Sequence, residues 1–327
     1  MRLVTKDDIT EIYSKVHQRG LSYLLSKIAF SGIKRTESTF NHETIAAANW
    51  WQVPEVKERV RMKETGNPKI GYEDYVVQKY LIKKNKLRLL SLGSGVCSHE
   101  LKFAAYDLFE EVKCVDLSQE PLRVAEKKAK ELGLGNMIFQ VSNVNESLLP
   151  SDHFDVVLFH SSLHHFKNVK ELIGKQIYST LKDDGLLIIN DYTGPNRLIW
   201  SERQLSESNR LLLSEIPEKY RKRLKTNRLK RSISGPGLIR MILSDPSEAV
   251  DSDNILPAIY DCFDVLEEKE VGGNLLMLIL KDIAHHFVDG GEETGQILRR
   301  LFDGEDEFIK EERSNQIFGV YRKKSEV

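Results

Sequence analysis

The chain has 327 residues, of which 40% are hydrophobic and 30% charged, a balance that is ordinary for a globular enzyme with a full core. Its formal net charge of −1 excludes a global attraction to nucleic acid or to an anionic membrane, so any such attraction must be local. No apolar run reaches the roughly 18 residues of a membrane-spanning helix, and the first residues do not resemble a signal peptide.

Residues 1–45 are predicted to be helical. Thr5 is a suitable N-cap, two acidic residues follow it in the first turn, and apolar side chains then recur at helical spacing. Gly20 is expected to end this helix before a second helix at residues 21–30.

The next segment is unusually rich in aromatic residues, and two interpretations of it stay open. It is either a helical cap packed on the following sheet or a segment that lines a substrate pocket with Trp50, Trp51 and Tyr75. We expect a helical cap over residues 1–80 and one main domain over residues 81–327.

From residue 87 onward, short apolar strands alternate with helices. The adjacent Leu89 and Leu90 are typical of a parallel strand that is covered on both faces. Alternation of this kind predicts an α/β fold with a mostly parallel sheet. The expected strands are residues 87–92, 112–115, 137–143, 154–161 and 185–191, and the expected helices are residues 121–132 and 169–181.

After the fifth strand the alternation stops, and residues 195–257 are expected to form a mostly helical insertion. The sheet resumes with a strand at residues 263–271. The segment 274–287 is ambiguous, but its apolar residues recur at helical spacing, which favours a helix. A last strand at residues 316–322 brings the sheet to seven strands, with the last one antiparallel.

A glycine turn directly after the first strand is the strongest functional signal. Gly93 and Gly95 let the backbone turn tightly and approach a ligand closely. Asp116 ends the second strand, where a carboxylate can accept hydrogen bonds from the two hydroxyls of a ribose. In open α/β sheets ligands bind outside the carboxyl ends of the strands, so five strand-end residues should converge on one crevice: Gly93, Asp116, Asn143, His160 and Asn190.

These features resemble the class I S-adenosylmethionine-dependent methyltransferases, from about residue 50 to the C-terminus. The family pattern is an acid, any residue and then Gly-x-Gly-x-Gly; here residues 91–97 are SLGSGVC, so Ser91 replaces the acid and Cys97 the last glycine. The resemblance implies a Rossmann-like seven-stranded sheet flanked by helices, the cofactor S-adenosyl-L-methionine, and a small-molecule acceptor.

The resemblance also implies which residues contact the cofactor. Asp116 would bind the ribose, and Leu117 and Ser118 would flank the adenine. Asn143 replaces a more frequent Asp, but its amide oxygen can still accept from the exocyclic amine. The cofactor-binding set is Ser91, Gly93, Ser94, Gly95, Asp116, Leu117, Ser118, Asn143, Val144 and His160.

Three histidines follow the fourth strand, beside the expected position of the methyl group. Histidine titrates near neutral pH and can accept a hydroxyl proton, so His164 or His165 is the candidate base. The alternative is that this pair caps the loop and the helix after it, and His160 would then orient the cofactor or the loop. No acidic partner stands at ligand spacing, so no metal is predicted.

Polar and aromatic residues after the fifth strand are candidates for binding the acceptor. Arg197 can clamp a phosphate or carboxylate, and Asp191 or Tyr192 can bond a hydroxyl. The alternative is that they brace the insertion. The substrate-binding set is Trp50, Trp51, Tyr75, Asp191, Tyr192, Asn196, Arg197 and Trp200.

The basic run at residues 219–231 is the main rival signal. Its commonest meaning is a solvated helix face, followed by a site for a phosphorylated or lipid-linked sugar, and then by RNA. The sequence therefore predicts methylation of a small molecule, most plausibly at a hydroxyl of a sugar or natural product. The alternatives are an RNA or protein methyltransferase that uses this run, and a non-catalytic scaffold that binds the cofactor.

The cysteines bear on the compartment of the protein. Three of them are scattered along the chain, and an odd scattered set argues against a disulfide framework and against a zinc site. A reducing cytoplasm is the expected location.

Overall fold

A computed structural model describes residues 2–10, 49–144, 149–224, 226 and 228–325. The predicted helix end at Gly20 and the helix at 21–30 lie outside these residues. The chain divides into two compact units: unit 1 contains Met1–Lys63, Gly194–Glu248 and Glu270–Gln316, and unit 2 contains Glu64–Thr193, Ala249–Lys269 and Ile317–Val327. The boundary expected near residue 81 stays a prediction.

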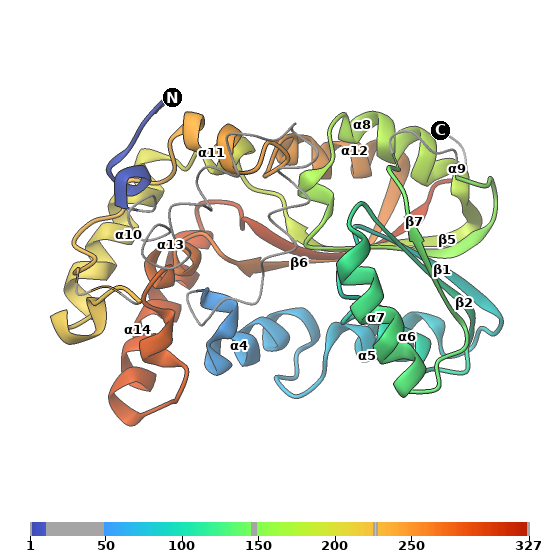
Figure 1. The fold of residues 1–327 in the computed structure, drawn as a ribbon, viewed down its shortest axis with the longest axis horizontal. Helices are drawn as coiled ribbons and strands as arrows, with labels where there is room; N and C mark the ends of the chain where they lie inside the picture. Colours follow the sequence, from blue (N-terminus) through green and yellow to red (C-terminus); the bar gives the residue numbers. More distant parts are fainter. Residues whose placement is uncertain (1, 11–48, 145–148, 225, 227, 326–327) are drawn as a thin grey trace. The chain divides into compact units, whose positions relative to one another are not determined.

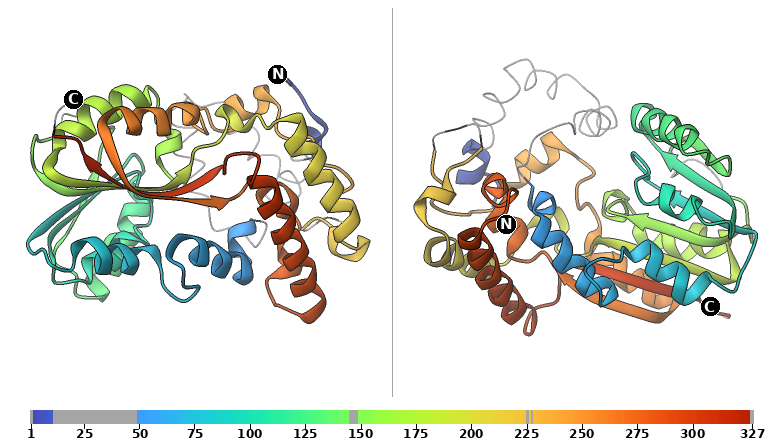
Figure 2. Two further views of the ribbon diagram at one scale, coloured as in Figure 1. Left: turned by 180° about the vertical axis from the view of Figure 1, so that it is seen from behind. Right: turned by 90° about the horizontal axis from the view of Figure 1, so that it is seen from below.

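A seven-stranded sheet is the centre of unit 2 (Figures 1 and 2). Its spatial order is β3-β2-β1-β4-β5-β7-β6, and β1 to β5 pair in parallel. The predicted fold, a mixed and mostly parallel Rossmann-like sheet flanked by helices, is therefore confirmed. The strands are β1 (Leu87–Leu92), β2 (Phe109–Asp116), β3 (Met137–Val141), β4 (Phe154–His160), β5 (Leu181–Tyr192), β6 (Phe263–Gly272) and β7 (Gln316–Lys323).

The inner strands are buried on both faces, as their continuous apolar sequences require. In β4 every residue from Val156 to Phe159 is fully buried. The register brings the ends of the strands to one edge: Ser91 lies opposite Leu158, and His160 lies opposite Asn190. The sheet thus positions the side chains that follow β1, β4 and β5.

Short helical segments cover both faces of this sheet. In Figure 1, α5, α6 and α7 lie on one face and α8, α9 and α12 on the other. The helix expected at 169–181 is present, but it is divided by a π-helical turn. The helical segments of unit 2 are α5 (Tyr72–Val76), η2 (Val77–Leu81), α6 (Glu100–Ala104), α7 (Gln119–Glu131), η3 (Leu163–His165), α8 (Val169–Glu171), η4 (Leu172–Ile177), α9 (Tyr178–Thr180), η7 (Ser252–Asn254) and α12 (Ile255–Cys262).

Unit 1 is helical, and the helix favoured over a strand at 274–287 forms as α13 and η8. The sequence did not predict α14. Two glycines lower the helix propensity of that segment, but one of them, Gly304, lets Leu211 of α10 approach closely. The segments are η1 (Trp50–Gln52), α4 (Pro54–Thr65), η5 (Asn196–Leu198), α10 (Glu202–Glu215), η6 (Glu218–Arg221), α11 (Leu238–Ser244), α13 (Leu276–Leu280), η8 (Ala284–Phe287) and α14 (Glu292–Ile309).

The basic run is not a solvated helix face, so that interpretation is wrong. Beyond η6, its described residues are extended or in turns, with an antiparallel bridge between Lys222 and Leu229. Arg223 is buried, and the ammonium of the buried Lys230 donates hydrogen bonds of 2.6–3.0 Å to three backbone carbonyls at the end of α13. These two cations therefore act inside unit 1.

Among the described residues, no helix is long and apolar enough to cross a bilayer.

Candidate functional site

The glycine turn after β1 is held against the ends of β2 and β4. Gly93 has φ +70° and donates its N–H to the Val115 carbonyl over 2.8 Å. A Cβ at Gly93 would lie 2.7 Å from the Cβ of Ser162, so no larger residue fits. A Cβ at Gly95 would meet no atom of the described residues within 4 Å, and this part of the turn therefore faces open space among them.

Asp116 ends β2 beside this turn. One carboxylate oxygen accepts the Gly95 N–H and the other accepts the Ser118 N–H, each over 2.8 Å. Each oxygen keeps a second lone pair, as two adjacent ribose hydroxyls require. The hydroxyl of Ser118 is buried, and no described residue bonds to it. Buried hydroxyls are normally hydrogen bonded, so the Ser118 hydroxyl is a candidate to bond to a ligand.

The residues predicted to contact the adenine lie around the same carboxylate. Leu117 is exposed, whereas Val144 is buried and Asn143 half-buried in the turn after β3. The backbone N–H of Ser142 donates to the Asp116 carbonyl over 3.0 Å, which joins this turn to the end of β2. Backbone hydrogen bonds therefore link the end of β2 to the turns that follow β1 and β3.

Ser91, which stands where the family pattern has an acid, is hydrogen bonded to an acid from elsewhere. Its hydroxyl donates to Glu100 Oε1 over 2.6 Å, and both side chains are buried. Burial raises the pKa of Glu100, and the hydrogen bond from Ser91 offsets only part of this effect. Glu100 was not among the residues predicted from the sequence, because an acid in the first turn of a short helix is a common feature without a ligand.

His160, at the end of β4, is packed among rings rather than presented as a base. Its ring lies 3.5 Å from that of His99 between centroids and stacks on Tyr72, whose hydroxyl lies 3.2 Å from Nδ1. Burial, together with the charge of His99, holds the pKa of His160 well below its usual value. His99 in turn contacts the buried Glu73, with 2.5 Å between Nδ1 and Oε1. His160 is therefore neutral, and its expected role in orienting the cofactor or the loop stays a prediction.

His164, in the turn after β4, is paired with Asp191 at the end of β5. The two approach to 2.5 Å between Nδ1 and Oδ1. The fully buried Asp191 also accepts the N–H groups of Ser162 and Leu163 over 2.8 and 2.7 Å. Burial alone would raise the pKa of Asp191, but His164 and these amides hold it below its usual value. Asp191 is thus ionised and fixes the ring of His164.

The other predicted substrate residues are distributed over both units. In unit 2, Tyr192 is buried beside His164, with 6.2 Å between ring centroids, and the Tyr75 hydroxyl donates to Glu267. In unit 1, Arg197 donates to the carbonyls of Pro246 and Glu248, which is the bracing role left open above. The remaining four residues also belong to unit 1: buried Trp50, and half-buried Trp51, Asn196 and Trp200.

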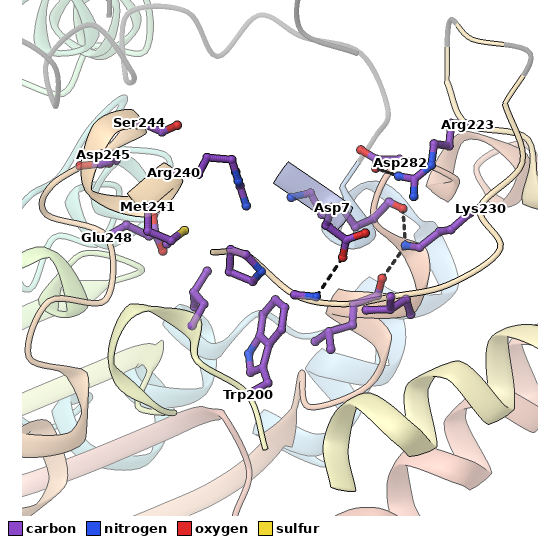
Figure 3. Close-up of a pocket in the computed structure, with 16 residues that line it drawn as sticks. Asp7, Trp200, Arg223, Lys230, Arg240, Met241, Ser244, Asp245, Glu248 and Asp282 are labelled. Atoms are coloured by element: carbon purple, nitrogen blue, oxygen red, sulfur yellow. Dashed lines mark hydrogen bonds and ion pairs between the residues drawn. The ribbon is translucent and has the colours of Figure 1, made fainter. Parts of the chain in front are cut away.

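Trp200 lines a cavity of about 280 Å³ within unit 1 (Figure 3). Apolar side chains share the lining with charged ones, and Arg223 and Asp282 lie paired at its edge. The indole N–H of Trp200 is buried, and no described residue accepts it. Unit 1 therefore contains a cavity in whose wall the Trp200 N–H is buried.

Comparison with known proteins identifies the family. A family model described as a methyltransferase domain matches residues 83–271, more than half of the chain. The uncharacterized methyltransferase YcgJ of Bacillus subtilis is 30% identical over 115 residues, which are 35% of this chain and 44% of YcgJ. This match thus spans less than half of the relative.

Two solved structures are similar in fold. A geranyl diphosphate C-methyltransferase from Streptomyces coelicolor, in complex with Mg²⁺, geranyl diphosphate and S-adenosyl-L-homocysteine, gives a TM-score of 0.50 at 12% identity, over 90% of this chain and 99% of that one. The YcgJ structure gives 0.43 at 17% identity, over 75% and 94%. The chain belongs to the methyltransferase domain family. The cofactor that the resemblance implies is S-adenosyl-L-methionine.

The residues at the ends of β1 and β2 fit this cofactor. The open space at Gly95, the two carboxylate oxygens of Asp116 and the orphaned hydroxyl of Ser118 offer room, acceptors and a donor for a nucleoside. The departures at Ser91 and Cys97 do not remove any of these groups. Cys97 adopts φ +54°, the left-handed conformation that the family's glycine favours.

Proposed function

We propose that this protein transfers the methyl group of S-adenosyl-L-methionine to a hydroxyl of a small molecule, with a sugar or a natural product as the acceptor and His164 as the base. The observation that carries the proposal is the His164–Asp191 pair. It follows β4 directly beside the glycine turn, because Ser162 packs on Gly93 and donates to the Leu92 carbonyl.

The cofactor, when bound, supplies a methyl group on a sulfonium, which leaves as a neutral thioether and needs no acid. What the chain must supply is a cradle and a proton acceptor. Asp116 would accept the ribose hydroxyls, and Ser118 and Asn143 would contact the adenine. Gly93 and Gly95 would pass close to the ligand without a side chain in the way, with Ser94 between them. Leu117 and Val144 would flank the adenine ring.

His164 has the features of a general base. Its Nδ1 lies 2.5 Å from Oδ1 of the ionised Asp191, which orients the ring, and Nε2 would be the atom that takes up the acceptor's hydroxyl proton. The negative charge of Asp191 also stabilises the imidazolium that forms. A positioned base of this kind accelerates methyl transfer to a hydroxyl by about 10²- to 10⁴-fold. We therefore assign Asp191 to positioning His164 rather than to binding a substrate hydroxyl.

One observation favours a small acceptor over RNA. Arg223 and Lys230 of the basic run are buried and bonded to groups of unit 1. The described cysteines are free and buried, in keeping with the reducing cytoplasm that we also propose.

Calorimetric titration with S-adenosyl-L-homocysteine tests the cofactor site. We expect Asp116→Ala to weaken binding by at least about tenfold, the low end for a lost hydrogen bond to a charged group. Asp107→Ala, at an exposed turn before β2, is the matched control and should bind like the wild type. Absence of binding to the folded wild type would overturn the proposed function, and unchanged binding by Asp116→Ala would overturn the ribose assignment.

Methyl transfer to a panel of hydroxylated sugars and natural products, followed by mass spectrometry, tests the base. His164→Gln should lower the rate by about 10²-fold or more and leave binding of S-adenosyl-L-homocysteine unchanged. The neighbouring His165→Gln should keep most of the activity. Full activity of His164→Gln would refute its assignment as base, and tight cofactor binding without transfer to any acceptor would favour the scaffold alternative.

A further inference from the structure

The buried carboxyl of Glu100 has no cationic partner among the described residues. Its side chain is 2% exposed, and the hydroxyl of Ser91 is its one bonded side chain. The two basic residues beside it in the sequence do not pair with it: His99 and Lys102 both contact Glu73, over 2.5 and 2.9 Å. An ionised carboxylate in such a place is costly unless a cation comes to it.

The position of this carboxyl points to the missing cation. Ser91 is in β1, two residues before Gly93, and Glu100 begins α6, the helix that follows the glycine turn. The turn therefore lies between the two residues in the sequence, and its open part is at Gly95. The cofactor of this turn is a zwitterion that carries a primary ammonium at the end opposite its adenosine.

We propose that Glu100 binds the ammonium of the methionine part of the cofactor, with Ser91 holding the carboxylate in place. This inference rests on the proposed function, since it concerns the same cofactor site. The hydroxyl of Ser91 cannot replace an acid by itself, because it carries no charge. It can instead fix an acid that reaches the strand end from the helix.

The raised pKa of Glu100 agrees with this assignment. Burial raises it, the hydrogen bond from Ser91 and the charge of His99 offset only part of this effect, and an ammonium docked on the carboxylate would reverse it. Glu73 provides the contrast within the same unit. Burial pushes its pKa upward too, but His99 and Lys102 outweigh burial and lower the pKa to about 2.

Ligands that differ only at the amino acid end provide the test. S-adenosyl-L-homocysteine carries the ammonium, its deaminated analogue lacks only that group, and 5′-methylthioadenosine lacks the whole amino acid part. In calorimetric titrations of the full chain, Glu100→Gln should weaken S-adenosyl-L-homocysteine by about 10- to 100-fold. It should change the affinity for the other two ligands by less than about twofold. Glu110→Gln, at an exposed ion pair with Arg88, is the control and should change none of them.

The outcomes separate this inference from the proposed function. Equal weakening of all three ligands by Glu100→Gln would indicate a structural role and overturn the inference, as would unchanged affinity for S-adenosyl-L-homocysteine. If Glu100→Gln does not fold, the wild type still decides: it should bind the deaminated analogue at least about tenfold more weakly than S-adenosyl-L-homocysteine, and equal affinities refute the role. Absence of binding of every ligand by the wild type overturns both.

Discussion

Glu267 in β6 is predicted to stabilise unit 2 in a strongly pH-dependent way. Its carboxylate accepts from Tyr75, Tyr80 and Lys79 over 2.8–3.0 Å and pairs with Lys269 at 3.0 Å. Burial alone would raise its pKa, but these donors lower it from 4.5 to about 2. Because one pKa unit corresponds to about 1.4 kcal/mol, the ionised group contributes about 3 kcal/mol at neutral pH.

The sign of the pH dependence follows from the lowered pKa. The stabilisation is complete above about pH 4.5 and is lost as the pH falls from 4.5 toward 2. Urea unfolding of wild type and Glu267→Gln, followed by circular dichroism, measures this contribution. We expect the two free energies of unfolding to differ by about 2–3 kcal/mol at pH 7 and by about half as much at pH 3.

The exposed pair of Glu110 and Arg88 supplies the control. Glu110→Gln should cost less than about 1 kcal/mol, because a surface ion pair is screened by solvent. A difference between wild type and Glu267→Gln that stays constant from pH 7 to pH 3 would refute the electrostatic reasoning. Equal stabilities of wild type and Glu267→Gln at pH 7 would show that water satisfies the donors around residue 267 as well as the carboxylate does.

Two further predictions concern stability. Gly93→Ala should lower the free energy of unfolding by about 2 kcal/mol or more, because its Cβ would press on Ser162. Gly95→Ala meets open space among the described residues and should cost only about 1 kcal/mol of backbone strain. Similar melting temperatures for the two variants would contradict this reasoning. Lys230→Met should cost about 1–2 kcal/mol at pH 7, since three buried carbonyls lose their donor while burial lowers the pKa of Lys230 to about 7. An unchanged midpoint in urea would show that these carbonyls find other partners.

The sheet could be predicted from the sequence because buried parallel strands are short, continuous apolar runs. β1 and β4 were located to within a residue at each end. β5 begins earlier than expected, at Leu181, because the polar residues 182–184 conceal its start. α14 was missed because packing, not propensity, decides its stability, and the space for Leu211 at Gly304 is visible only in three dimensions.

The candidate site, like the fold, could be predicted only in part. Strand ends could be located, so the positions of Asp116 after β2 and of His164 after β4 could be predicted, whereas their roles stay predictions. Which side chains bond to each other depends on pairs far apart in the sequence: Asp191 looked like a substrate ligand, but His164 and backbone amides occupy its carboxylate. The Ser91–Glu100 bond was likewise hidden, because a sequence does not show which way a helix turns its first residue.

The position of β7 has a consequence for the synthesis of this protein. β7 lies between β5 and β6, although β6 precedes it in the chain, and its fully buried Phe318 and Tyr321 fill the core of unit 2. A chain that emerges from the ribosome N-terminus first can pair β1 to β5 as they appear. β6 pairs only with β7, so it stays unpaired until residue 323 has been synthesised. The edge of β5 stays unpaired during that interval and is open to wrong pairing with other chains.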